Sequence, residues 1–169
     1  MKYEQEISFE NETSATSIAK KMKDEAESIA EEMQTNNFAI ISACNRSMSK
    51  EETITATDSL VSDFEKGKFK NLLMIPIQGH YKYSDGTMAD ERSMMFSSET
   101  LTKEFVEKVA KKYNQESYIY NMVLYDTKTG EVILNFNKII IKDTSFFEKN
   151  GEENYSTLGI FPEISFKFE

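Results

Sequence analysis

The amino-acid sequence predicts an α+β fold, in which a mixed, mainly antiparallel sheet is packed by about three helices in a single layered domain. Two observations support this prediction. Segments with apolar residues at helical spacing are interspersed with short strand-like runs, in the approximate order α, β, α, β, β, α, β, β, β. In addition, 169 residues are enough for one domain with a sizeable core and too few for two domains that each have such a core.

Three segments have the spacing of amphipathic helices. The first covers about 14–34, with an apolar stripe opposite charged residues. The second follows the string "SKEE", in which Ser49 as N-cap and Glu52 three residues later have the spacing of a capping box. We expect it to end at Gly67 in a left-handed conformation. The third helix covers about 100–113.

Short apolar or alternating runs predict the strands. Pro76 lacks a backbone donor, so the run "LLMIPI" is expected at a sheet edge or at a bulge. The string "SDGT" predicts a turn between two strands, and 146–159 predicts a loop. The segment 117–125 is apolar on both faces, which is typical of a central strand. The predicted strands cover 38–44, 72–83, 91–97, 117–125, 131–142 and 164–168.

The formal net charge is −9, and residues 1–35 carry nine acids and four lysines. The expected organisation is a single domain over 1–169, with an acidic tail and helix over 1–34 that are peripheral to a core over 38–168. That helix is a candidate contact for a partner or for a second copy of the chain, so a homo-oligomer is possible. The acidic charge argues against direct nucleic-acid binding.

Several features predict a cytoplasmic protein without a membrane segment. The longest apolar run is much shorter than a membrane-spanning helix, and the first residues lack the apolar segment of a signal peptide. The single cysteine, Cys44, excludes an internal disulfide and fits a reducing compartment.

The common catalytic motifs are missing from the sequence. It contains no glycine-rich phosphate loop and no dinucleotide fingerprint. One histidine and one cysteine cannot build a usual zinc site, so we expect neither metal nor cofactor. A Ser-His-Asp triad would have to use His80, and Cys44 is expected to be an inert buried residue. Carboxylates at 90, 91 and 116 leave acid–base chemistry open.

Polar residues cluster at the ends of the predicted strands, where scaffolds often present functional groups. Arginine is rare in this chain, so its two copies are candidates for specific partners. We expect the clustered residues to converge on one rim of the sheet as a ligand or partner site. The candidates are Asn45, Arg46, Ser49, His80, Tyr81, Glu91, Arg92, Gln115 and Glu116.

A structural interpretation stands beside this one. Arg46 could pair with an acid such as Glu52 and fix its loop. Arg92 could be the polar end of an otherwise apolar strand face. A lone histidine such as His80 is more often a satisfied structural residue than a ligand.

The string "ISACNRSMSKEE" and the later "QGHY", "DERS" and "NQES" resemble small uncharacterised accessory proteins of tailed phages and bacteria. The resemblance covers about 38–120, with Thr53 where that family often has Asn. It implies a phage-borne accessory gene acting in the host cytoplasm, and it specifies no activity. The matching residues are Ser42, Asn45, Arg46, Ser49, Glu51, Glu52, Gly79, Tyr81, Glu91, Ser93, Gln115, Glu116 and Ser117.

Three functional hypotheses follow. The first is a non-catalytic binder that inhibits a host defence or housekeeping factor. The second is a protein that sequesters a small nucleotide-like anion between Arg46, the helix start at Ser49, His80 and Tyr81. The third is a hydrolase or transferase that uses Glu91 or Glu116.

Overall fold

The computed structural model describes residues 3–9, 17–82 and 85–169. Within these ranges the helices are α1 (Ser17–Thr35), α2 (Lys50–Lys66), α3 (Lys103–Lys112) and α4 (Thr144–Lys149). The strands are β1 (Glu4–Ser8), β2 (Asn37–Ile41), β3 (Leu73–Lys82), β4 (Met88–Ser98), β5 (Ser117–Tyr120), β6 (Val123–Asp126), β7 (Val132–Asn135), β8 (Lys138–Asp143), β9 (Tyr155–Leu158) and β10 (Ile164–Phe168).

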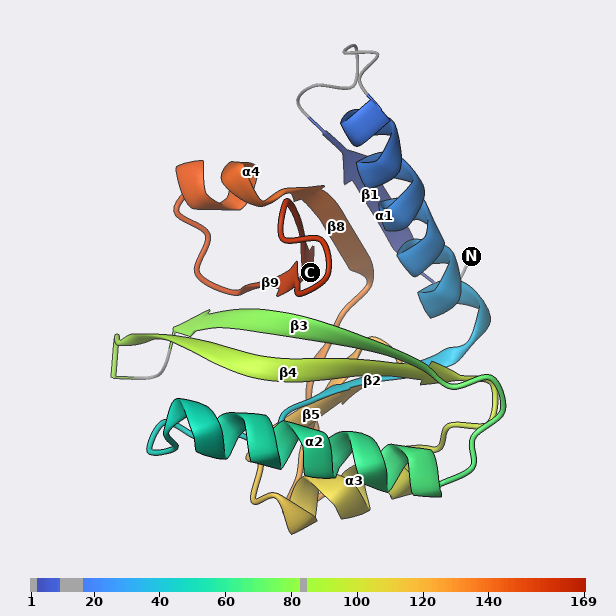
Figure 1. The fold of residues 1–169 in the computed structure, drawn as a ribbon, viewed down its shortest axis with the longest axis vertical. Helices are drawn as coiled ribbons and strands as arrows, with labels where there is room; N and C mark the ends of the chain where they lie inside the picture. The colour runs from blue at the N-terminus through green and yellow to red at the C-terminus, as the bar shows by residue number, and fades with distance from the viewer. Residues whose placement is uncertain (1–2, 10–16, 83–84) are drawn as a thin grey trace.

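Residues 37–120 form a βαββαβ unit. Its strands lie in the order β3-β4-β2-β5, and each neighbouring pair is antiparallel. This connectivity and strand order define the ferredoxin-like, or split βαβ, arrangement. Both crossover helices, α2 and α3, lie on the same face of these strands (Figure 1).

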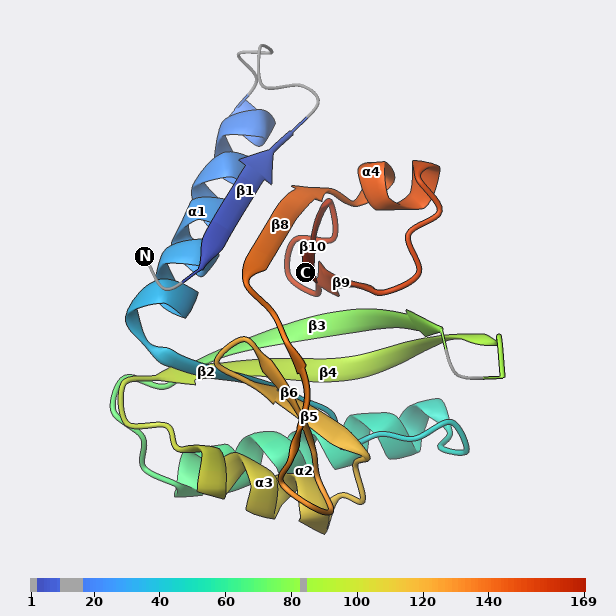
Figure 2. The ribbon, with the colours of Figure 1, turned by 180° about the vertical axis from the view of Figure 1, so that it is seen from behind.

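The sheet continues beyond both edges of this unit. On one side β5 is followed by β6 and β7, and on the other β3 is followed by β9, β10, β8 and β1. Among the described strand pairs, only β1 with β8 is parallel. The sheet curls, so that β1, β8 and α1 stand beyond the β3–β4 hairpin, away from α2 and α3 (Figures 1 and 2). The predicted α+β fold with a mixed, mainly antiparallel sheet is confirmed.

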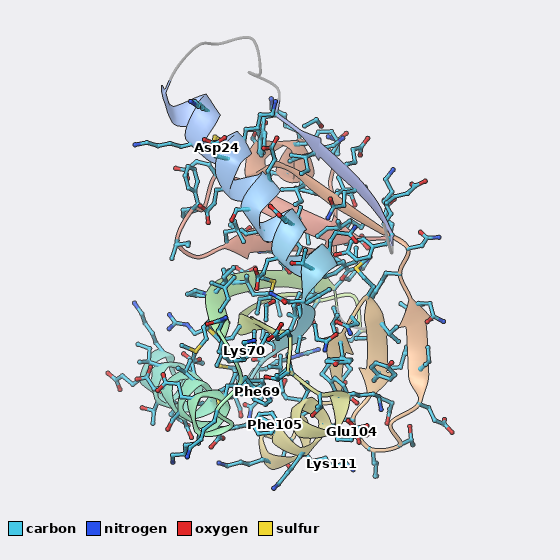
Figure 3. All side chains as sticks on the ribbon, turned by 90° about the vertical axis from the view of Figure 1, so that its right-hand side faces the viewer. Asp24, Phe69, Lys70, Glu104, Phe105 and Lys111 are labelled. Carbon is cyan, nitrogen blue, oxygen red and sulfur yellow. The ribbon has the colours of Figure 1, made fainter. Side chains whose placement is uncertain are left out.

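Each face of the central strands contributes to a separate apolar core. On one face Phe64 of α2 stacks on Phe96 of β4, with ring centroids 3.6 Å apart. Beside them Phe69 and Phe105 meet edge to face at 4.7 Å, between α2 and α3 (Figure 3). On the other face Met95 packs in a cluster with residues of α1, β8 and β10.

Helix α1 is part of this second core, which corrects the expectation that 1–34 is peripheral. Ala26, Ala30 and Met33 are buried and share a cluster with Ile139 and Phe166. The reason is that α2 and α3 both cover the same face of the sheet. The opposite face is also apolar, so it needs α1 to exclude water from it.

Two local expectations are also corrected. Gly67 has a right-handed φ of −68°, and the left-handed residue is Lys68, with φ of 54°. Strand β3 is not an edge strand of the sheet, because it lies between β4 and β9. The β9 ladder begins only after Pro76, so this residue needs no donor there, and its carbonyl accepts from the Gly159 amide at 2.8 Å.

Three segments divide differently from the prediction. The segment 117–125 is two strands, because Asn121 and Met122 have φ of 46° and 65° and turn the chain back. The run 131–142 divides into β7 and β8, which lie in distant parts of the sheet. The expected loop at 146–159 contains the end of α4 and the whole of β9.

We predict that Met33→Ala lowers the free energy of unfolding by about 2–5 kcal/mol, because Met33 is 1% exposed and its truncation leaves a cavity. The matched control Met88→Ala, at a methionine that is 55% exposed, should change it by less than about 0.5 kcal/mol. Urea denaturation of both variants checks this. Equally small losses in the two variants would mean that α1 does not contribute to the core.

Candidate functional site

Strand alternation divides the candidate residues between two faces. Gly79 lies opposite Glu91 in the β3–β4 ladder. Tyr81 and Glu91 share the face that includes the α1 core, and His80 and Arg92 share the other face. The expectation of a single pocket that contains both His80 and Tyr81 is therefore wrong, because consecutive residues of a strand point to opposite faces. Whether either set binds a ligand stays a prediction.

Glu91 is a partly buried carboxylate with a perturbed pKa. Burial raises the pKa of Glu91, the Ser42 hydroxyl lowers it, and the negative charge of Glu116 raises it, so the net direction is upward. Directly opposite Glu91, the ring of Tyr81 occupies the space that a side chain at Gly79 would need. The surroundings of Glu91 therefore include the Ser42 hydroxyl, the Tyr81 ring at Gly79 and the negative charge of Glu116.

The loop before α2 is held by its own polar side chains. Asn45 Oδ1 accepts from the Ser47 amide at 3.0 Å and from the Ser47 hydroxyl at 2.7 Å. Ser49 and Glu52 form the predicted capping box. Arg46 pairs with an acid, as the structural interpretation expected, but the acid is Asp85 at 3.3 Å, next to the β3–β4 turn, and Glu52 instead accepts from the Ser49 amide.

The remaining candidates have mixed roles. The Gln115 side-chain amide donates to the Cys44 carbonyl at 3.1 Å and ties the segment before β5 to the segment after β2. Cys44 is free and buried, as predicted. Glu116 and Arg92 are exposed, and the backbone carbonyl of Arg92 accepts from the Ser42 hydroxyl at 2.7 Å.

On the opposite face, His80 belongs to a line of hydrogen bonds. Its Nδ1 lies 2.6 Å from Asp90 Oδ1, and its Nε2 lies 3.1 Å from Thr157 Oγ1. From Thr157 the line continues to the Ser165 hydroxyl at 2.8 Å and then to the Thr144 hydroxyl at 2.7 Å. We call these five residues the relay. Its first three members have the order of a carboxylate, an imidazole and a hydroxyl.

The three hydroxyl residues of the relay were not predicted from the sequence. Thr157 lies in a segment predicted as a loop, and Thr144 is the first residue of α4, a helix that was not predicted. Alternation within "ISFKF" does place Ser165 on the face opposite Ile164 and Phe166. That signal was present, but nothing indicated which strand lies beside it.

The edge of the sheet at β7 exposes a row of aliphatic side chains. Among the described strands, β7 is the last in the sheet order and pairs with β6 alone. Val132, Ile133 and Leu134 are 52%, 49% and 51% exposed. Edge strands usually carry charges or proline that block further pairing, and β7 has neither.

A small cavity of about 180 Å³ lies between α1, β2 and the β5–β6 turn. The Tyr3 hydroxyl is buried, and burial, opposed in part by Gln5, raises the pKa of Tyr3 to about 12. The lining residues are Tyr3, Met33, Phe38, Asn121, Met122, Val123 and Phe136. Within the described ranges, no group of three or more His, Cys, Asp or Glu residues could hold a metal ion, and no helix could cross a membrane.

No protein-family model and no curated protein matches this chain. Among solved structures, a phage SAM lyase in complex with S-methyl-5'-thioadenosine is similar at 14% identity and a TM-score of 0.33. The similarity covers 59% of this chain and 84% of that chain. A likeness this remote supports no argument about function.

We predict that Glu91→Gln stabilises the fold at neutral pH. Because the pKa of Glu91 is raised in the fold, ionising this carboxyl destabilises the native state as pH rises through the folded pKa. The gain should be present at pH 7 and disappear below about pH 4, where the glutamate is protonated in both states. Thermal unfolding from pH 4 to 8 measures it, with Glu131→Gln as an exposed control. A gain that is independent of pH would contradict the shift.

Proposed function

We propose that this protein acts by binding another protein without turnover, and that strand β7 makes the contact. The observation that supports this most directly is the run Val132–Leu134, which is half exposed on an edge strand. The free edge also presents backbone donors and acceptors that β6 does not use. An extended segment of a partner can add to such an edge as a further strand, with main-chain hydrogen bonds for affinity and side-chain contacts for specificity.

Charge restricts the kind of partner. The chain has a net charge of −9, and β7 itself carries no charged residue. A neutral or basic extended segment is therefore favoured over an acidic one and over a nucleic acid. The sequence resemblance to phage accessory proteins supports a host protein as this partner, with inhibition of a defence or housekeeping factor in the host cytoplasm as the outcome.

The test is a comparison of partner retention by the wild-type chain and by Ile133→Lys. A lysine on the edge opposes strand addition, so we expect retention of a protein from a bacterial host lysate to fall about tenfold or more. The free energy of unfolding should change by less than about 0.5 kcal/mol, because the residue is half exposed.

The matched control is Ile160→Lys, at an isoleucine that is 64% exposed and lies outside any strand. It should retain the partner as the wild type does. Equal retention by both variants would exclude β7 as the contact. Analytical ultracentrifugation of the free chain identifies the case in which β7 pairs instead with a second copy, because the wild type would then be a dimer and Ile133→Lys a monomer.

A second candidate function is acid–base chemistry by Glu91 and Glu116. The observation that favours it is the raised pKa of Glu91, to which burial and the charge of Glu116 both contribute. Two carboxyls with pKa values that differ are the usual basis of acid–base pairs. The nucleotide-sequestering alternative has less support. Its four residues do not share one face, and the Ser49 hydroxyl is engaged by the Glu52 amide at 3.1 Å.

A further inference from the structure

The hydrogen bonds of the relay have a direction that can be followed from one fixed end. That end is the Pro162 carbonyl, which can only accept. The Thr144 hydroxyl donates to it at 2.6 Å. A hydroxyl has one proton, so Thr144 has none left for its second contact, which is Ser165 Oγ at 2.7 Å. Ser165 must therefore be the donor to Thr144.

The same count of one proton for each hydroxyl extends along the relay to His80. Because Ser165 has used its proton, Thr157 must donate in the 2.8 Å contact between their hydroxyls. The Thr157 oxygen can then only accept from His80 Nε2, which lies 3.1 Å away. Nε2 therefore carries a hydrogen.

The other ring nitrogen faces a carboxylate. Asp90 Oδ1 lies 2.6 Å from His80 Nδ1. A neutral ring with its hydrogen on Nε2 would place an acceptor against an acceptor at this distance. We propose that His80 is held as an imidazolium that donates from both nitrogens. We further propose that the relay acts as a proton-dependent latch, meaning that the hydrogen bonds by which it joins neighbouring strands depend on this proton. The chain is then one charge unit less negative than its formal −9.

Strands β4 and β9 supply the groups that contact the ring. Strand β4 supplies Asp90, and β9 supplies Thr157 and Tyr155, whose ring stacks on the imidazole at 4.5 Å. Burial raises the pKa of Tyr155, and the charges of Glu148 on α4 and Asp90 raise it as well, so the phenol is neutral beside His80 at pH 7.

The direction of the relay also excludes its use as a catalytic triad. A nucleophilic hydroxyl must point its proton at the imidazole, which then accepts it. Here the Thr157 proton points away, to Ser165. The latch instead joins β3 and β4 to β9, β10 and the start of α4, and loss of the proton from His80 removes one of the two ring hydrogen bonds. This inference is independent of the proposed binding at β7.

The test uses NMR on the untagged protein, in which His80 is the only histidine. Ring ¹⁵N shifts at pH 7 should show both nitrogens protonated. Thr144 is separated from the ring by two hydroxyls, those of Ser165 and Thr157. The substitution Thr144→Val removes the acceptor of Ser165, so Ser165 can donate to Thr157 and Thr157 can donate to Nε2. A neutral ring then fits the relay, so the ratio of imidazolium to neutral imidazole should fall about fivefold, the change expected for one ordinary hydrogen bond.

The control is Thr144→Ser, which keeps the hydroxyl and should keep the wild-type ratio. A purely structural role for Thr144 would not move the protonation of a ring that it does not touch. Ser165→Ala offers a second route, because it removes the acceptor for Thr157 and should lower the ratio in the same way. A neutral ring in the wild type at pH 7, or identical ratios in Thr144→Val and Thr144→Ser, would overturn the latch.

Discussion

The two-residue alternation of the β3–β4 ribbon is the constraint on which the rest of the structure depends. Ten consecutive residue pairs fix its register. Ile75, Ile77 and Met95 face the core that α1 closes, while Met94 and Phe96 face α2 and α3. A slip of one residue in either strand would exchange its two faces and disrupt both cores at once. The positions of Glu91 and His80 on opposite faces are a consequence of the same register.

Local signals predicted the parts of the fold that depend on short-range chemistry. The capping box at Ser49 and Glu52 fixed the start of α2 correctly. The string "SDGT" likewise predicted two strands joined by a turn, and β3 and β4 are paired antiparallel on either side of it. These predictions hold because their cause lies within a few residues of chain.

Features that depend on distant neighbours were not predictable in this way. The stripe of α1 is ordinary for a surface helix, and its burial follows from the placement of α2 and α3 on one face. Pro76 looked like an edge residue because nothing in the sequence shows where the β9 ladder begins. The relay joins Asp90 to Thr144 through four strands and a helix start, so no local spacing reveals it.

Most groups of the described polar clusters are engaged in hydrogen bonds within the protein. The hydroxyls and amides of the α2 loop are engaged in local contacts, and the relay directs the Thr157 proton away from His80. Glu91 is a titratable side chain whose role these contacts do not explain. By contrast, β7 presents a half-exposed aliphatic row and an edge without a neighbouring strand. The fold therefore presents its clearest unsatisfied surface at the far edge of the sheet from α1.

Backbone hydrogen exchange of β7 tests this account most directly. In the free chain the outward amides of Val132–Asn135 should exchange quickly, because β6 pairs with only one edge of the strand. In the complex purified from host lysate, protection should increase in β7 and stay unchanged in β3 and β4. Protection that appears instead around Glu91 and the loop before α2, with β7 still exchanging quickly, would contradict the account.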